Sequence, residues 1–541
     1  MKAMNFFEKN FFKFLFLIYF FIGFAIVGDY GISIDEEFQR YSGFYWLCYV
    51  LEFLPFDNFR LEAVNKLNDI KGLTLPNPVD FPFYGVVFDL PLALLETIFK
   101  FEDSRSYFLF RHQATFLIFF ISSIYFSFLI KSRFKNKIIT LFGTLLYISS
   151  PRIFGDSFYN NKDLILLSLV TISLYYFFKL IDNLNIKNLF FFSVFAALTS
   201  ALRILGIFLP ATCLFFLFIQ KNSYKEKILN SSLLLIFFII FLILLWPYLW
   251  SNPWGNFLNS FSIFSKYIIK IQMLFNGEYI YSNRLPMSYV PVWIFITTPF
   301  ITLLLFFYGY FFSFKRFYLR VVRIRDDMPF NDFWRGKNEN KDLIIFFMFN
   351  LFFFYIILSS TVLYTGWRHL YFLHSFIIYL SCIGISLLNI NFKKTKIVFF
   401  SVGILILFNF YEIIRYHPFQ SLYFNQLIQE NKKKDFEIDY WGLAGVKFLK
   451  EIIALENSKK IINVGVASYI PLERSIKLLN EKEQKLINVV GQDYEKADYI
   501  FNNNLSEVNK LINKKYLIPN NFKKISDFVI NEFIIYEIYK R

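Results

Sequence analysis

The feature that most constrains this chain is a series of apolar runs, separated by short polar loops, between residues 14 and 414. A helix needs about 20 largely apolar residues to cross a bilayer. Several runs are shorter, so their ends must extend into flanking polar residues or break inside a helix bundle. The runs lie at residues 14–27, 113–130, 138–150, 164–180, 189–202, 207–219, 228–250, 289–312, 344–363, 371–390 and 397–414.

Composition supports a membrane protein. Hydrophobic residues make up 56% of the 541 residues, and the mean hydropathy is +0.44. A soluble chain has a lower apolar share, collected around compact cores. We therefore predict an α-helical polytopic membrane protein with about 11 transmembrane helices, with the lipid bilayer as its surroundings. The net charge of +16 does not indicate a nucleic-acid partner, because Lys and Arg gather in the loops.

Loop charges predict the orientation. Basic loops at 131–137, 221–227, 315–325 and 393–396 all fall on the side of the N-terminus if the chain crosses eleven times. The positive-inside rule then places the N-terminus in the cytoplasm and everything after residue 415 outside. No small-residue cleavage site follows the first run, which predicts an uncleaved first helix.

Two parts of the chain are expected outside the membrane. The first outer loop, residues 28–112, contains apolar stretches at 41–54 and 86–99 that suit helices at the membrane surface. Residues 1–414 are predicted to form the transmembrane domain and residues 415–541 a small α/β extracytoplasmic domain. Its predicted strands are 461–466, 486–490, 499–502 and 528–539, with helices at 448–455 and 472–479.

An acidic cluster follows the first apolar run directly. Asp35, Glu36 and Glu37 lie within about ten residues of its end. Carboxylates in a loop are often only solvated charges, but these precede an amphipathic surface segment, and a second polar cluster occurs in the next outer loop. We therefore predict a cavity at the bilayer surface, rank Asp35 and then Glu36 as functional, and expect Glu37 to be solvated.

Three later outer segments carry candidate phosphate ligands. Arg152 and Lys162 can hold a phosphate, as a fork and as a point charge, while Asp156 or Asp163 can join a metal or orient the cations. Each segment also has a structural explanation. The segment with Arg152 and Lys162 can be a polar hinge between helices, Arg203 in the second can simply reach the membrane interface, and the third can belong to an aromatic belt. Ionisable residues near short helices favour function. The last segment is a turn that contains Trp367, Arg368 and His369.

Other chemistries lack a pattern in the sequence. Cys48, Cys213 and Cys382 lie far apart, without C-x-x-C spacing, and no H-x-x-H or HExxH motif occurs. Walker and Rossmann glycine patterns are absent, which argues against ATP-driven transport and nicotinamide chemistry. No cofactor is indicated with certainty, and a divalent metal ion stays open.

These segments together resemble a known family. The acidic pair, the long first outer loop, SPRIFGDSFYNNKD, ALRILG, the GWRH turn and the tail segments YHPFQSLYFN and FEIDYWG are similar to membrane glycosyltransferases of the GT-C fold. The resemblance is to the protein O-mannosyltransferase and aminoarabinose-transferase superfamily, glycosyltransferase family 39 and its bacterial relatives. It covers residues 11–414 and the junction with the tail.

The resemblance implies an enzyme of the bacterial plasma (inner) membrane that transfers a sugar, hexosyl or pentosyl, from a polyprenyl-phosphate donor to an acceptor on the outer face, with inversion. The acceptor can be a protein, a lipid or a glycan. By position, Asp35 matches the base that activates the acceptor hydroxyl, and Glu36 supports it or helps to bind a cation. Glu37 and Asp156 depart from the family pattern, in which relatives often have Pro and His. The cations are donor-phosphate ligands, namely Arg152, Lys162, Arg203 and Arg368; Asp156, Asp163, Trp367 and His369 are candidate substrate or cation contacts.

Three other functions are weighed against this one. A transporter or flippase for a lipid-linked glycan predicts ionisable residues near the midplane of several spans and repeat symmetry, and the sequence shows little of either. A surface-polysaccharide polymerase or ligase predicts long outer loops late in the chain, whereas the longest outer loop here is the first. A structural scaffold for the outer domain leaves the acidic pair unexplained.

Overall fold

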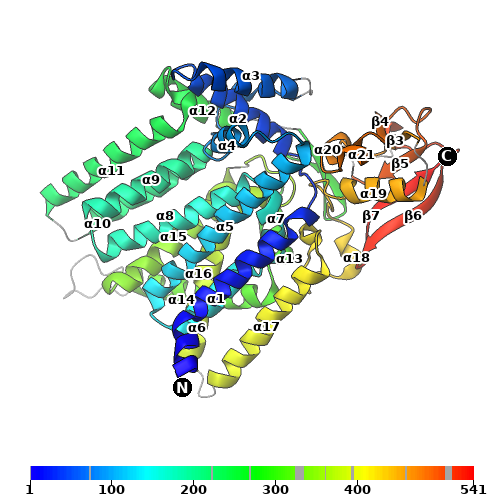
Figure 1. Ribbon diagram of the computed structural model, residues 1–541. Coiled ribbons are helices and arrows are strands. Elements are labelled where there is room, and N and C mark those ends of the chain that lie inside the picture. Colours follow the sequence, from blue (N-terminus) through cyan, green and yellow to red (C-terminus); the bar gives the residue numbers. More distant parts are fainter. Residues whose placement is uncertain are drawn as a thin grey trace.

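The computed structural model describes residues 2–71, 75–220, 223–266, 270–322, 334–359, 361–391, 395–456, 460–505 and 514–541. Parts of three predicted basic loops, at 221–222, 323–325 and 393–394, lie outside these residues. Within them, seven helices are long and apolar enough to cross a membrane. They run side by side as a bundle (Figure 1). They are α1 (Lys2–Ile26), α5 (Ser104–Phe134), α8 (Asp163–Asp182), α11 (Tyr224–Leu245), α14 (Phe300–Val322), α15 (Gly336–Leu358) and α17 (Thr395–Arg415).

The remaining predicted runs form shorter or bent helices. The pair α6 (Lys137–Ile148) and α7 (Pro151–Tyr159) is bent by 60° and makes an eighth candidate span if the two count as one. Three more apolar helices are shorter, so the predicted number of eleven crossings stays a prediction, although each predicted run overlaps one of these helices. The short helices are α9 (Ile186–Leu202), α10 (Phe208–Ile219) and α16 (Leu373–Asn391).

One predicted span is broken in the structure. The run at 289–312 was expected to be continuous, but it forms α13 (Tyr289–Thr297) and then α14, with Pro299 at the break. Proline lacks the N–H that an inner helix position needs, and it disfavours helical geometry in the residue before it. Thr298 accordingly has an extended backbone, with φ −84° and ψ 135°.

The first outer loop contains three helices, at one end of the bundle (Figure 1). The two that were predicted are α2 (Glu36–Leu51) and α4 (Asp89–Phe99). The third, α3 (Asp57–Lys71), was missed because its sequence is mostly polar. Three of its apolar residues, Ala63, Leu67 and Ile70, are buried and pack with residues of α2 in a small separate core.

A second outer segment was also missed. Between α11 and α13 the chain forms α12 (Pro253–Lys266) and an antiparallel hairpin of β1 (Gln272–Phe275) and β2 (Glu278–Tyr281). The turn of this hairpin contains Asn276 and Gly277, both with positive φ. An Asn-Gly turn of this kind matches the twist of paired strands. The hairpin lies beside the tail, because Gly277 N–H donates to the carbonyl of Asp435 over 2.9 Å.

The tail contains a five-stranded mixed sheet of order β4-β3-β5-β7-β6, which lies beside one end of the bundle (Figure 1). Strands β3 (Ile462–Val466), β4 (Ile487–Gly491) and β5 (Tyr499–Asn502) are parallel and match three predicted strands. The fourth prediction, one strand at 528–539, was wrong. That region belongs to the antiparallel hairpin of β6 (Lys523–Ile530) and β7 (Phe533–Lys540), with Asn531 at positive φ in the turn.

Helices of the tail are mostly short. The predicted helix at 448–455 corresponds to α19 (Gly445–Glu456), and the prediction at 472–479 corresponds to a single turn, α20 (Glu473–Ile476). Two other short helices are α18 (Glu430–Lys433) and α21 (Glu481–Gln484). A mostly helical membrane protein with a small C-terminal sheet domain, as predicted, is therefore what the structure shows.

Candidate active site

A cavity of about 370 Å³ lies where the first outer loop, the later outer turns and the tail meet. Its lining includes five of the residues that the sequence marked as functional, from four separate segments. They are Asp35, Lys162, Arg203, Arg368 and His369.

Asp35 carries the acidic side of the cavity. It is the N-cap residue of α2, a position that Asp favours because its carboxylate can accept from the first backbone N–H groups. Here the side chain makes no capping bond. It accepts a hydrogen bond from Arg368 Nη1 over 2.5 Å, and 35% of the side chain stays exposed. The carboxylate is therefore oriented by a cation and still open to the cavity.

Arg368 and Arg203 share a second carboxylate. Asp163, the first residue of α8, has its Oδ1 atom 2.5 Å from Arg203 Nη2 and its Oδ2 atom 3.9 Å from Arg368 Nη1. In the part of the chain that the structure describes, the buried Nε atoms of both arginines have no hydrogen-bond partner. Buried donors normally have a partner. Two neighbouring guanidinium groups in the lining of one cavity suit an anionic ligand such as a phosphate.

Lys162 lies on the same wall. Its ammonium group donates to the carbonyl of Gly85 over 2.7 Å and lies 3.9 Å from a carboxylate oxygen of Asp89. Burial lowers the pKa of Lys162 to about 8 and raises the pKa of Asp89 to about 6. Both side chains are buried, and the loss of hydration shifts their pKa values more than their mutual attraction shifts them back.

The main chain brings this wall together. Tyr84 forms an isolated antiparallel bridge with Arg203, at the end of α9. The next residue, Gly85, lies so close to α9 that a Cβ atom there would overlap the carbonyl oxygen of Ala201. Only glycine permits that approach. The ring of Tyr84 lies 5.3 Å from Lys162 Nζ and 5.5 Å from the Arg203 guanidinium carbon.

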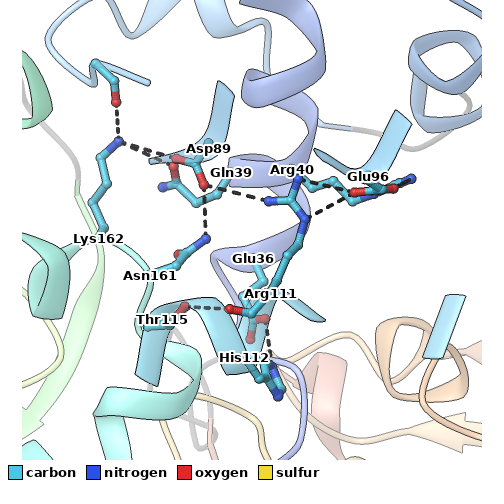
Figure 2. A network of polar contacts seen from close by, with 11 residues as sticks. Glu36, Gln39, Arg40, Asp89, Glu96, Arg111, His112, Thr115, Asn161 and Lys162 are labelled. Atoms are coloured by element: carbon cyan, nitrogen blue, oxygen red, sulfur yellow. Dashed lines mark hydrogen bonds and ion pairs between the residues drawn. The ribbon is translucent and has the colours of Figure 1, made fainter. Parts of the chain in front are cut away.

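A buried polar network supports α2 behind the cavity (Figure 2). Glu36 accepts from Ser33 N–H over 2.6 Å and lies 2.8 Å from Nε2 of His112 in α5. Glu96 of α4 binds Arg40 of α2 over 2.5 Å and Arg111 of α5 over 3.3 Å. Glu96 is paired with two arginines, and Glu36 is hydrogen-bonded to Ser33 and His112, so the network joins α2, α4 and α5 through satisfied carboxylates.

Several candidates from the sequence do not line the cavity. Glu36 is among them, and three others make contacts inside the protein. Arg152 donates to the carbonyl of Tyr423 over 2.9 Å, Asp156 accepts from Tyr159 over 2.7 Å, and Trp367 donates to Thr297 over 2.8 Å.

The expectation that Glu37 is solvated was wrong. Its carboxylate lies 2.5 Å from Lys477 Nζ, and its side chain is only 12% exposed. The partner belongs to the tail, so this acidic residue attaches the C-terminal domain to α2.

Sequence reasoning missed part of the lining. Glu437 and Tyr440 belong to the quoted FEIDYWG segment, and Tyr364 lies two residues before the GWRH motif, but no role was assigned to them. The β1 residues Gln272 and Met273 also contribute. The only signal available was an acidic and aromatic segment near the start of a soluble tail.

A protein-family model matches the segment that contains Lys162 and Arg203. Residues 87–250 match the model of the family described as dolichyl-phosphate-mannose-protein mannosyltransferase. The chain resembles this mannosyltransferase family. The match contains Lys162, Asp163 and Arg203, and it confirms the predicted resemblance over that region; Asp35 and Arg368 lie outside it.

Two solved structures align with nearly the whole chain at low similarity. Two crystal structures of ArnT from Cupriavidus metallidurans, one bound to undecaprenyl phosphate and one in the apo state, each align with 98% of this chain and 98% of their own. Both have 10% sequence identity and a TM-score of 0.45. The comparison with curated proteins gives no match. In the described residues, no group of three or more His, Cys, Asp or Glu side chains is arranged to hold a metal ion.

Proposed function

We propose that this protein is an inverting membrane glycosyltransferase that moves a sugar from a polyprenyl-phosphate donor to an acceptor hydroxyl on the outer face of the membrane. One observation carries the proposal. A half-open carboxylate, Asp35, shares a cavity with three cations, Lys162, Arg203 and Arg368, at the ends of apolar helices. The mannosyltransferase family match over residues 87–250 supports the same reading.

The three cations have the chemistry of a donor-phosphate site. The guanidinium groups of Arg203 and Arg368 can bind phosphate oxygens, and Lys162 adds a third positive charge. Such groups stabilise the charge that develops on a phosphate leaving group. Asp163 bridges the two arginines and orients them, so we assign it a positioning role.

Asp35 is placed to act as the general base. The acceptor hydroxyl oxygen attacks the anomeric carbon, its proton passes to the Asp35 carboxylate, and the bond from the anomeric carbon to the phosphate oxygen breaks. The phosphate leaves with the bonding electron pair, and polyprenyl phosphate is the second product. Attack opposite to the leaving group inverts the anomeric carbon, and the protein forms no covalent intermediate.

Glu36 has a different place in this scheme. Its carboxylate fixes the turn before α2 through Ser33 and attaches α2 to α5 through His112. We therefore propose that Glu36 positions Asp35 instead of sharing its chemistry.

The test of the proposed function follows the lipid carrier. Purified protein in lipid nanodiscs is incubated with labelled polyprenyl-phosphate sugars and a panel of protein, lipid and glycan acceptors. Release of polyprenyl phosphate together with inverted product supports a transferase. Movement of intact donor across a vesicle membrane without cleavage would instead identify a flippase and overturn the proposal.

A further inference from the structure

The tail supplies part of the lining of the cavity. Four lining residues come from beyond residue 415, namely Glu437, Tyr440, Tyr469 and Leu505. The membrane helices and outer turns therefore enclose only part of the space, and the proposed cation site lies on the part that they form.

Two of these residues follow adjacent parallel strands. Tyr469 comes just after β3 and Leu505 just after β5, and Tyr469 N–H donates to the carbonyl of Leu505 over 3.0 Å. The carboxyl ends of these strands thus face the cavity. In open α/β sheets, this is the edge at which ligands bind.

The tail is attached close to the proposed base. Ile34, the residue before Asp35, donates its backbone N–H to the carbonyl of Trp441 over 3.1 Å. Asp439 joins the same segment to the sheet, because it accepts from Leu443 N–H over 3.0 Å and from the Asn503 amide over 3.4 Å. The FEIDYWG segment is therefore held between the loop that carries Asp35 and the strand ends.

Glu437 is the acidic group that this segment brings to the cavity. It is only 8% exposed, and its carboxyl accepts a hydrogen bond from the backbone of Leu274 in β1. Burial raises the pKa of Glu437 to about 8. A protonated carboxyl both donates and accepts hydrogen bonds, as a sugar hydroxyl does.

We propose that the C-terminal domain forms the sugar end of the donor site, and that Glu437 binds a hydroxyl group of the sugar carried by polyprenyl phosphate. The cations receive the phosphate at one wall, and Glu437, with the neighbouring ring of Tyr440, receives the sugar at another. This inference rests on the proposed function and adds the residue that selects the donor sugar.

The predicted consequence is discrimination by hydroxyl pattern. A site built to hydrogen-bond a substrate hydroxyl rejects an analogue that lacks it much more strongly than an apolar pocket can. We expect the wild type to reject one mono-deoxy form of its preferred sugar, and we expect Glu437→Ala to lose that discrimination.

The test measures binding by the full-length protein in detergent. The ligands are bare polyprenyl phosphate and its mannose, glucose and galactose derivatives. For the sugar whose derivative binds most tightly, the series of mono-deoxy analogues is added. Glu437→Ala should lower affinity for the preferred donor on the order of tenfold, which corresponds to one lost hydrogen bond. Its affinity for bare polyprenyl phosphate should not change. The affinity of Glu437→Gln for the preferred donor should stay within a few-fold of the wild-type affinity. Glu430→Ala changes an exposed residue of α18 and should bind the donor as tightly as the wild type.

Several outcomes would overturn the inference. Equal affinity of wild type and Glu437→Ala for the donor would do so, and so would an equal loss of affinity for bare polyprenyl phosphate, which would indicate a general defect. Unchanged donor binding with a raised KM for an acceptor would assign Glu437 to the acceptor instead. Failure of the wild type to bind any polyprenyl-phosphate ligand would count against the proposed function itself, which keeps the two failures distinct.

Discussion

The Asp35 carboxylate lies 2.5 Å from the Arg368 guanidinium, although 333 residues separate them in the chain. The pair joins the first outer loop to the last outer turn before the tail. Under the proposed function, Arg368 has two anionic partners, because the donor phosphate binds at the same guanidinium as the base. Donor binding and orientation of Asp35 are then coupled through one side chain.

Replacing Asp35 with Asn should remove most turnover without weakening donor binding, because Arg368 keeps its charge and loses a competing carboxylate. A general base contributes on the order of 10²- to 10⁴-fold to the rate, and kcat should fall by that amount. Carrier release in single-turnover experiments measures the effect. Asp29→Asn is the matched control, since Asp29 lies in the same loop with a side chain that is 54% exposed. Normal kcat in Asp35→Asn would refute its role as base.

Removing the Arg203 charge should affect stability and donor binding separately. Arg203→Gln leaves the buried Asp163 carboxylate without its nearest partner, which costs about 3 kcal/mol of unfolding free energy. The double variant Arg203→Gln, Asp163→Asn should recover much of that stability, because it removes the unpaired charge as well. Thermal unfolding in detergent measures this effect.

Both of these variants should bind polyprenyl phosphate about tenfold or more weakly than the wild type, because a hydrogen bond to a charged group is lost. Recovery of donor affinity in the double variant would show that Arg203 acts only through packing and would contradict its assignment to the phosphate.

Binding of bare polyprenyl phosphate should weaken as pH rises through about 8. The folded-state pKa of Lys162 is lowered to about 8, so its positive charge is present below that pH and is lost above it. The titration is best measured in the Glu437→Gln background, because the pKa of Glu437 is also about 8. Lys162→Arg stays charged across this range, and its affinity should not change with pH; a decline as steep as that of the parent protein would exclude Lys162 as the titrating group.

Replacing Glu36 with Ala should lower the free energy of unfolding and leave kcat of the folded protein largely unchanged. The change leaves Ser33 N–H and His112 without a buried partner, which costs about 1–3 kcal/mol. Unfolding in detergent and kcat of the folded fraction are the two measurements. Glu37→Ala, which removes an ion pair to the tail, serves as comparison. A loss of kcat in Glu36→Ala as large as in Asp35→Asn, at normal stability, would instead make Glu36 part of the chemistry.

Local patterns in the sequence predicted much of the fold. Apolar runs marked the membrane helices because the bilayer imposes a length on them, and short apolar runs of strand length marked β3, β4 and β5. The helix α3 was missed because most of its residues are polar, and the β6–β7 turn was missed because Asn531 stands among apolar residues. The prediction of one span at 289–312 overlooked the effect of Pro299 on the helix.

The sequence predicted several residues of the candidate site, but it did not predict which of them contact one another. Lys162, Arg203 and Arg368 stood out because charged side chains are costly beside short apolar helices. Their partners could not be predicted, since no local rule relates Asp35 to Arg368 or Asp163 to Arg203. Glu437 was overlooked because a carboxylate in a soluble tail is ordinary until the fold brings it to a cavity.

Gly85 carries no functional group, yet it controls the spacing of two cations. Its carbonyl holds Lys162, and the contact of its backbone with Ala201 sets how close the loop comes to Arg203. A single methyl group at this position would act as a wedge, moving the lysine wall away from the arginine wall without altering any charge. Sequence variation at residue 85 can therefore disable the cavity while every ionisable residue in it is retained.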